Sequence, residues 1–480
     1  MPKSKQFRDP VHGYIPIREE YCSLFIDTPI FQRLREIEQT GMSVLFPCAR
    51  HDRFSHSLGV FYLGRKAFHR FRLNSESVFG AIDSKLWESY GNSFLIACLM
   101  HDCAHSPFSH IFEWCYDFKG DKHQPSLLKE LLFQIIDDKK FKTDYQKREE
   151  RNLSPQPHEK ASAYIAFKHF SDKIISCNAN PNLIVRMILG CRHFNAENDN
   201  EKLENCLIDL LNGRAIDVDK LDYILRDTWS SGVNNIMIDI DRLLSSLTVR
   251  FRDKELSYKK QALNSIRSVI DGRNYLYKWI YSHHKIIYNQ YLLNESLRKL
   301  AKIENQNDSS LFLRALFSVE AFEKEVVLSK KWKIYLPTDH DIMYMLKQYY
   351  KEIPEAEEYL FRLNHKVALW KTLEEFKYYL GDPNDQKRYE IFSVAEDRLN
   401  KKYSVGSQEK KFVLCEAQPQ LTGIKEGEII IEIDKREREY ESYSALLGKL
   451  EPEKPYYFYL YVPREMLKNK TEILQELKKI

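Results

Sequence analysis

The stretch Phe94-Leu-Ile-Ala-Cys-Leu-Met-His-Asp-Cys-Ala-His-Ser-Pro-Phe-Ser-His110 joins an apolar run to the densest cluster of polar residues in the chain. The apolar run is typical of a buried helix that leads directly into His101 and Asp102. A histidine beside a carboxylate offers the neutral imidazole and the anionic oxygen that first-row divalent ions accept. We therefore expect His101 and Asp102 to bind a metal ion, with further ligands supplied from elsewhere in the chain.

The overall composition is that of a water-soluble globular protein. Hydrophobic residues make up 43% and aromatic residues 13% of the 480 residues, enough to build a core, and the mean hydropathy is −0.51. The 73 basic residues nearly balance the 69 acidic ones, so the formal net charge of +4 indicates neither a polyanion binder nor an acidic tail. Collagen, a disordered chain and a disulfide miniprotein are excluded.

Cysteine usage and apolar runs predict a cytoplasmic location. The nine cysteines include no Cys-x-x-Cys pair and form an odd set, which favours neither a disulfide framework nor a zinc ribbon. The first residues, Met1 to Phe7, lack an apolar signal region. The longest apolar run, Phe94–Met100, is far shorter than the ~20 residues of a membrane span. We expect neither export nor membrane insertion.

The pattern along the chain predicts a mostly α fold with a small C-terminal α+β module. We expect a helical catalytic core over residues 1–300, a helical extension over 301–400 and the α+β module over 401–480. The module is predicted from strand-like runs at 412–415, 428–433 and 456–462, with helices at 442–450 and 465–479. The tyrosine run from Tyr456 to Tyr461 fits either an interface or a small core.

Two other segments offer the further metal ligands. Arg53-Phe-Ser-His-Ser-Leu-Gly59 contributes His56, and Asp217-Val-Asp-Lys-Leu-Asp222 contributes Asp219. Together with His101 and Asp102 they make a set of two histidines and two aspartates drawn from three distant helices. Any one of these histidines alone is more simply explained as a core or surface residue, but the ordered set is not.

This order of ligands resembles that of the HD-domain metal-dependent phosphohydrolases, and in particular their dGTPase-like branch, the deoxynucleoside triphosphate triphosphohydrolases. The resemblance runs from about residue 7 to 300 and is carried by five segments: residues 9–13, 25–35, 53–59, 101–110 and 217–227. The chain is similar to the catalytic domain of the dNTPases that carry a SAM domain and an HD domain, without the SAM domain.

The resemblance implies a reaction and a set of catalytic residues. A divalent ion (Mg, Mn or Fe) held by His56, His101, Asp102 and Asp219 would polarise the α-phosphate of a dNTP and activate the attacking water. The products would be a deoxynucleoside and inorganic triphosphate. His110 matches the general acid, Glu113 lies one helical turn on where it can orient His110, and His105 and His158 match further active-site histidines.

The resemblance also assigns residues to the substrate, namely Arg53, Gln39, Thr40, Lys220, Tyr223, Asp227, Arg273, Tyr277 and Tyr281. The arginines and the lysine would grip the phosphate chain. Tyr223 would stack on the sugar, Tyr281 would close the space beside C2′, and Asp227 would accept from the 3′-hydroxyl. Gln39 and Thr40 would face the nucleobase, although the family has a bulky apolar residue where Thr40 stands.

A second nucleotide site is implied at a subunit interface, where relatives bind an activating guanine nucleotide and form tetramers. Lys5, Asp27, Gln32 and Arg35 match the residues of that site, while Arg8 stands where asparagine is found. The resemblance therefore implies a homo-oligomer with an activating nucleotide. The alternative is that Asp27 caps a helix beginning near Pro29 and that Arg35 belongs to a solvated face.

Two other functions stay open beside the dNTP triphosphohydrolase. One is an HD-type phosphohydrolase of nucleoside monophosphates or cyclic nucleotides. The other is a nucleotide-sensing or nucleic-acid-binding module with a vestigial metal site, for which the basic segments 139–142 and 398–402 are candidates. The small net charge predicts no broad cationic face for nucleic acid. A dNTPase would act in dNTP housekeeping or in defence against phage by depleting dNTPs.

Overall fold

The structure is a computed structural model that describes residues 3–116, 127–233, 236–306, 308–381, 385–403, 410–417, 428–447 and 458–480. It is built mainly from helices with four small sheets among these residues, which confirms the predicted mostly α fold. No helix among the described residues is both long and apolar enough to cross a membrane.

The chain begins with an antiparallel hairpin that the helical pattern did not predict. Strands β1 (Ser4–Asp9) and β2 (Gly13–Arg18) pair along their whole length, and Gly13 has a positive φ of 76° in the turn. Short helical segments follow: α1 (Glu19–Tyr21), η1 (Cys22–Ile26), α2 (Pro29–Gln32), η2 (Arg33–Glu36) and η3 (Gly41–Val44). They cover one side of the core.

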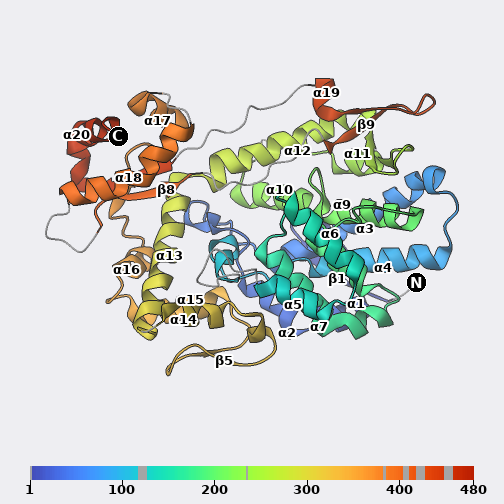
Figure 1. Cartoon of the computed structure of the whole chain (residues 1–480), viewed down its shortest axis with the longest axis horizontal. Helices are drawn as coiled ribbons and strands as arrows, with labels where there is room; N and C mark the ends of the chain where they lie inside the picture. The colour runs from blue at the N-terminus through green and yellow to red at the C-terminus, as the bar shows by residue number, and fades with distance from the viewer. Residues whose placement is uncertain are drawn as a thin grey trace.

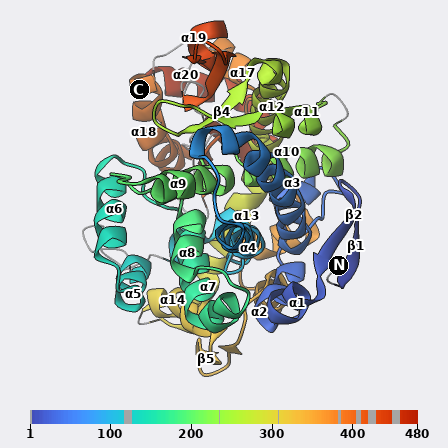
Figure 2. The same cartoon turned by 90° about the vertical axis from the view of Figure 1, so that its right-hand side faces the viewer.

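The helical core is arranged around α4 (Ser84–Met100). Figure 2 shows α4 end-on at the centre of the molecule, with other core helices around it. The surrounding elements are α3 (Arg53–Phe79), α5 (Leu127–Ile135), α6 (Lys139–Glu150), α7 (Pro157–Ser176), α8 (Pro181–Leu189), α9 (Asp199–Asn212) and α10 (Val218–Ser231). The end of α4 from Ile96 to Met100 is completely buried, so the helix predicted from its apolar run is the centre of the core.

The core continues through a small sheet into a long helix. Its elements are α11 (Ile240–Ser245), β3 (Leu247–Val249), β4 (Leu256–Lys259), η6 (Lys260–Ala262), α12 (Leu263–Tyr275), η7 (Leu276–Tyr281) and α13 (His284–Glu304). Helix α13 leads from the core to the extension: Ile286 near its start packs in the main core, whereas Leu297 and Leu300 pack with Phe312 and Leu316 of the extension.

The extension consists of α14 (Ser309–Leu316), η8 (Val319–Phe322), β5 (Val326–Val327), β6 (Lys333–Ile334), α15 (Asp339–Tyr349), α16 (Pro354–Phe361), β7 (Lys366–Ala368), α17 (Leu373–Leu380) and α18 (Asp385–Tyr403). The proposed division at residues 300 and 400 stays a prediction. Hydrogen bonds cross the first of these boundaries: Arg33 Nε in the core donates to the Pro337 carbonyl at 2.6 Å.

The last 70 residues form the predicted strands, but these join two different sheets. Strands β9 (Ile430–Asp434) and β10 (Glu439–Ser442) extend the core sheet in the order β10-β9-β4-β3. Strands β8 (Val413–Glu416) and β11 (Phe458–Pro463) pair with β7 of the extension. Figure 1 shows the consequence: α19 (Tyr443–Leu447) lies next to the β9–β10 strands, far from α20 (Lys470–Lys478).

The C-terminal tyrosine run belongs to a core in its described part. Tyr456 and Tyr457 lie outside the described residues, whereas the chain from Phe458 to Val462 is almost completely buried in β11. The predicted helix over 465–479 begins as the turn η10 (Arg464–Asn469) and continues as α20. The structure therefore favours the small-core interpretation of this segment.

Candidate active site

Four predicted metal ligands meet at one point inside the core. His56 Nε2 lies 3.3 Å from His101 Nε2 and 3.0 Å from Asp219 Oδ1. Asp102 Oδ2 lies 3.8 Å from His56 Nε2 and 3.6 Å from His101 Nε2. Donor atoms that share one ion at ~2.1 Å are roughly 3–4 Å apart, so this spacing fits a divalent ion held by His56, His101 and Asp102, with Asp219 beside both histidines as a fourth donor. We call these four residues the metal group.

Hydrogen bonds orient the two histidines of the metal group. His56 Nδ1 lies 2.8 Å from Asp222 Oδ2, and His101 Nδ1 lies 2.9 Å from the Cys98 carbonyl oxygen. Because each Nδ1 is engaged outside the group, each Nε2 is left to face it. The arrangement is the one found where histidines bind a metal and a second layer of acceptors fixes their tautomer.

The charge around His56 also suits a cation. Burial alone would lower the pKa of His56, but its hydrogen bonds with Asp219 and Asp222 raise the pKa to about 9. Burial would likewise raise the pKa of Asp222, but Arg226 and the hydrogen bonds from His12 and His56 hold it well below its usual value. Carboxylates thus favour a positive charge at His56, and a divalent ion can take the place of the proton that they attract.

Polar N-cap residues position the helices that carry His56 and Asp219. Helix α3 starts at Arg53 because Asp52 caps it, accepting from the Ser55 amide at 2.7 Å, and this places His56 on the first turn. Asp217 caps α10 in the same way, accepting from the Lys220 amide at 2.7 Å. Two polar caps therefore fix where two ligand-bearing helices begin.

Helix α10 carries the predicted metal and sugar residues on one face. Three residues stand at four-residue intervals, so they are spaced about 6 Å apart along the helix axis: Asp219, Tyr223 and Asp227. Asp222 and Arg226 lie on the neighbouring face, toward α3. One helix thus contributes both a metal ligand and the support for another ligand.

A second cluster of titratable side chains adjoins the metal group and contains His105, His110, Glu113 and His158. Glu113 forms short ion pairs: it accepts from His158 Nδ1, and His110 Nδ1 lies 3.0 Å from Glu113 Oε2. The rings of His105 and His158 are stacked with centroids 4.4 Å apart. His110 Nε2 lies 3.4 Å from Arg53 Nη2, which links this cluster to the metal group.

Burial and charge separate the roles within this cluster. Burial would raise the pKa of Glu113, but His158 and His110 hold it well below its usual value. Burial would lower the pKa of His158, but Glu113 raises it to about 9. Burial, with Arg53 and His158 nearby, holds the pKa of His105 well below its usual value. The cluster therefore contains a charged pair beside a neutral imidazole, and its four donor atoms are also close enough to share an ion.

The predicted phosphate-binding residues are engaged with the protein. Arg53 is buried and donates from Nη1 to Asp102 Oδ2 at 2.6 Å and from Nε to Ser109 Oγ at 3.0 Å. Lys220 Nζ contacts the Asp217 carboxylate and donates to the Gly213 carbonyl at 2.8 Å. These contacts hold both cations close to the metal group.

The predicted sugar residues form a network around Asp227. The Tyr281 hydroxyl donates to Asp227 Oδ2, and His51 Nε2 lies 2.6 Å from Asp227 Oδ1. The Tyr277 ring is perpendicular to Tyr281, with centroids 4.9 Å apart. Burial first, and then the neighbouring Asp227, hold the pKa of Tyr281 well above its usual value, so its phenol stays protonated.

Further contacts join this network to the phosphate-binding residues. The Arg273 guanidinium lies 4.0 Å from the centre of the Tyr277 ring and hydrogen-bonds with Tyr223. Among the residues predicted to face the nucleobase, Gln39 Oε1 and Thr40 Oγ1 are buried without a hydrogen-bond partner among the described residues. Because a buried polar atom without a partner costs about 1–3 kcal/mol, Gln39 and Thr40 are candidates to bind a ligand.

The residues predicted for an activating nucleotide gather on the surface beside the β1–β2 hairpin. Lys5 Nζ lies 2.7 Å from Asp27 Oδ2, and both side chains are about half exposed. Gln32 Oε1 accepts from Arg35 Nε at 2.9 Å. The alternative role for Asp27 is wrong, because Thr28 is the residue that caps α2, accepting from the Phe31 amide.

Three supporting residues were not predicted as site residues. Asp222 orients His56, and His12 Nε2 lies 2.6 Å from Asp222 Oδ1. His51 supports Asp227. Two of them, His12 and Asp222, stand inside segments that carry the family resemblance, and His51 precedes the Arg53 segment by two residues. The sequence therefore marks the places of these residues, but it does not show which residues they support.

Comparison with known proteins finds relatives named as a dNTP triphosphohydrolase and as an HD-domain protein. No family model matches the chain. The deoxynucleoside triphosphate triphosphohydrolase SAMHD1 homolog of Dictyostelium discoideum is 28% identical over 290 residues, covering 58% of this chain and 46% of that protein. A protein of Acanthamoeba polyphaga mimivirus named for an HD domain is 26% identical over 330 residues, covering 65% of this chain and 62% of that protein.

The fold is shared with a solved phosphohydrolase from Bacteroides thetaiotaomicron, with a TM-score of 0.60 and 21% identity over 96% of this chain and 100% of that one. The chain spans about half the length of the curated relatives it matches. These homologues confirm the resemblance to the HD-domain dNTPase-like family. They support an HD-type phosphohydrolase, and the histidine and aspartate clusters point to a divalent metal.

Proposed function

We propose that the protein is a metal-dependent dNTP triphosphohydrolase that releases a deoxynucleoside and inorganic triphosphate. The observation that carries the proposal is the metal group, in which the two histidine Nε2 atoms lie 3.0–3.8 Å from each other and from the aspartate oxygens, joined through Arg53 to His110. A divalent ion bound there (Mg, Mn or Fe) would supply a polarised phosphate and an activated water.

The side chains of the chain itself would do the rest of the work. Arg53 and Lys220 would hold the phosphates beside the metal group, and Arg273 would extend the positive charge along the chain of phosphates. His110 would give a proton from Nε2 to the O5′ leaving oxygen. Glu113 supports that role because a carboxylate at His110 Nδ1 stabilises the protonated ring.

The sugar and base residues would set the specificity. Asp227 would accept from the 3′-hydroxyl, Tyr223 would stack on the sugar, and the Tyr281 ring would leave no room for a 2′-hydroxyl. Tyr277 would line the same side of the pocket. Gln39 Oε1 and Thr40 Oγ1 would meet the nucleobase, which would give both buried atoms a partner.

Regulation belongs to the same proposal. Lys5, Asp27, Gln32 and Arg35 would bind an activating nucleotide at the interface of a homo-oligomer. The ion pair between Lys5 and Asp27 supports this, because a guanine edge could compete for Asp27 and a phosphate for Lys5.

The test is product analysis. The purified protein is incubated with Mg²⁺ or Mn²⁺ and each dNTP, singly and as a mixture, because an activator can differ from the substrate. Deoxynucleoside together with intact triphosphate is the expected result, and His101→Ala should abolish it. An HD-type phosphohydrolase of nucleoside monophosphates or cyclic nucleotides would instead cut those substrates and leave every dNTP intact.

A further inference from the structure

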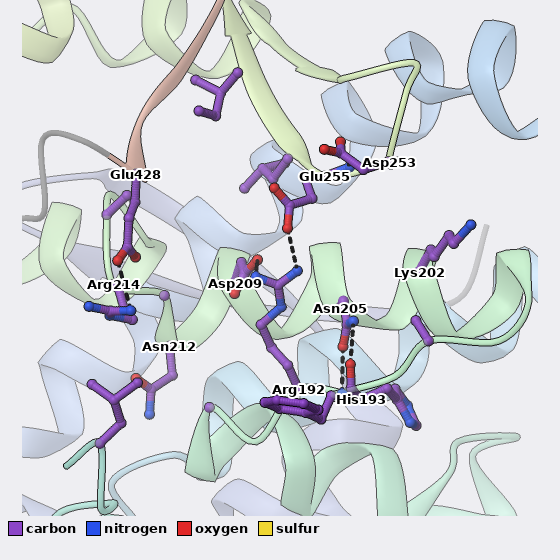
Figure 3. A pocket seen from close by; sticks show the side chains of 18 of the residues that line it. Arg192, His193, Lys202, Asn205, Asp209, Asn212, Arg214, Asp253, Glu255 and Glu428 are labelled. Carbon is purple, nitrogen blue, oxygen red and sulfur yellow. Dashed lines mark hydrogen bonds and ion pairs between the residues drawn. The ribbon is translucent and has the colours of Figure 1, made fainter. Parts of the chain in front are cut away.

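A second cleft lies outside the candidate active site (Figure 3). It has a volume of about 660 Å³ and is bounded by α6, the chain that follows α8, helix α9, the β3–β4 hairpin and the start of β9. None of the metal-group residues lines it. The volume is within the roughly 300–1,000 Å³ typical of pockets that bind small molecules.

Each acidic side chain of the cleft is paired with an arginine. Five carboxylates line it, and each has an arginine nitrogen at 2.5–3.6 Å: Asp144, Asp209, Asp253, Glu255 and Glu428. Figure 3 shows two of these pairs, Arg192 with Glu255 and Arg214 with Glu428. Four arginines (Arg186, Arg192, Arg214 and Arg250) serve these five carboxylates, so most of the negative charge of the acids is balanced.

Three cations of the cleft have no carboxylate within ion-pair distance among the described residues. They are Arg148, Arg151 and Lys202. Arg148 donates from Nη1 to the Gly190 carbonyl, but its Nε is buried without a hydrogen-bond partner. Arg151 lies over the Phe194 ring at 4.3 Å. Unpaired cations in a partly enclosed cleft focus a positive potential, which an anion would relieve.

We propose that this cleft binds a polyphosphate group, separately from the metal group. Three cations match the several negative charges of a polyphosphate better than the single charge of a carboxylate. The planar forks of Arg148 and Arg151 suit phosphate oxygens, and Lys202 adds a point charge. Free inorganic triphosphate and the phosphate tail of a nucleotide share this chemistry.

The base of the cleft leads to the candidate active site. Gly213 lines the cleft, and its carbonyl accepts from Lys220 Nζ at 2.8 Å. Asn212 also lines the cleft, and its Nδ2 donates to Glu159 Oε1 at 2.9 Å, next to His158. A ligand that moves this short segment would move side chains of both catalytic clusters, so the site is placed to regulate as well as to bind.

The experiment is a binding titration of the metal-loaded full chain by calorimetry, first with inorganic triphosphate and then with ATP. The test variant combines Arg151→Ala with Lys202→Ala and keeps Arg148, which supports the Gly190 carbonyl. The matched control combines Lys85→Ala with Lys139→Ala, two exposed lysines outside the cleft. Each lost charge-assisted contact weakens binding by about tenfold or more.

We expect the test variant to lose one binding event, or to bind at least about tenfold more weakly, while the control matches the wild type. A loss seen with triphosphate alone assigns the cleft to the free anion, and a loss seen with ATP assigns it to a nucleotide tail. Equal binding of both ligands by the test variant and the wild type would overturn the proposal. Because no turnover is measured, this result is independent of whether dNTPs are cut.

Discussion

At the scale of single residues, the metal group depends on which ring nitrogen each histidine presents. His56 and His101 both direct Nε2 inward because Asp222 and the Cys98 carbonyl engage Nδ1. Such supporting hydrogen bonds typically contribute 10–100-fold to metal affinity, and a ligand itself contributes more. The four donors should therefore act as one unit.

The first prediction concerns His101→Ala. It removes one of four donors and leaves the helix intact. We therefore expect the affinity for the divalent metal to fall at least about 100-fold while the fold persists. Metal content after dialysis, with circular dichroism, measures both. His69→Ala on the exposed face of α3 is the control and should keep its metal. Full metal occupancy in His101→Ala would show that the ion is held elsewhere, for example by the His105 cluster.

The pair formed by His158 and Glu113 makes stability depend on pH. The folded pKa of His158, about 9, is above its unfolded value of ~6.5, so its contribution is complete below pH 6.5 and is lost as the pH rises through 9. Glu113 has a lowered pKa, so its contribution is present above ~4.5 and is lost as the pH falls. The pair stabilises most between these limits.

The second prediction follows from these signs. His158→Gln should lower the free energy of unfolding by up to about 3 kcal/mol near pH 6, and the difference from wild type should shrink toward pH 9.5. Urea unfolding at constant ionic strength measures this difference in unfolding free energy. The other histidines contribute equally to the variant and the wild type, so they do not affect it. His69→Gln should show no such trend. A difference that stays constant from pH 6 to 9.5 would mean that His158 is not held charged by Glu113.

Sequence reasoning reached most single residues of the site but not their supports. The metal ligands stand in short segments rich in histidine and aspartate, and the role of His110 follows from the resemblance of its segment to the HD-domain family. The supporting roles of Asp222 and His51 could not be assigned, because nothing in the local sequence shows which residue each one holds: their partners are 166 and 176 residues away and only the fold brings them together. Contacts at such separation depend on packing, which one sequence does not encode locally.

At the scale of elements, the close approach of α3 and α10 decides the geometry of the metal group. A Cβ added at Gly59 would lie 1.9 Å from Asp222 Oδ1 and 2.4 Å from Arg226 Nη2. Only glycine lets the Asp222–Arg226 pair lie against α3, where it orients His56. Gly59 is therefore as necessary to the site as the side chains that it accommodates.

The third prediction is that Gly59→Ala destabilises the protein by about 2–4 kcal/mol. Alanine is favoured in a helix by up to about 1 kcal/mol, but the overlap with Asp222 outweighs that gain. Metal affinity should fall as well, because His56 loses its support. Thermal unfolding and metal titration measure the two effects. Gly41→Ala, where the nearest atom is 3.8 Å away, is the control, and equal behaviour of the two variants would refute the packing argument.

The sequence pattern predicted elements better than their partners. Strands near 412–415, 428–433 and 456–462 were predicted from β-branched and aromatic runs, and the described residues contain strands at Val413–Glu416, Ile430–Asp434 and Phe458–Pro463. Their division between the core sheet and the extension sheet was not predicted, because alternation fixes which side chains are buried and not which strand lies alongside. The short β1–β2 hairpin was not predicted, because helical spacing dominates the segment that follows it.

At the scale of the whole molecule, the extension supports the candidate active site directly. Asp339 in α15 accepts from the Phe108 amide at 2.6 Å and from the Glu38 amide at 2.9 Å. These amides belong to the two chain segments that carry His110 and Gln39. The expected boundary near residue 300 therefore separates parts that depend on each other for the shape of the site.

The fourth prediction tests that dependence with Asp339→Ala. Two part-buried amides would lose their acceptor, at up to about 1–3 kcal/mol each, so we expect both a lower unfolding free energy and faster hydrogen exchange at Glu38 and Phe108. Glu352→Ala, an exposed change in the same extension, is the control and should alter neither. Unchanged exchange at both amides would mean that the core holds these segments without the extension. If exchange is faster at these amides while metal stays bound, the extension shapes the segments that carry His110 and Gln39. The core then builds the metal group without the extension.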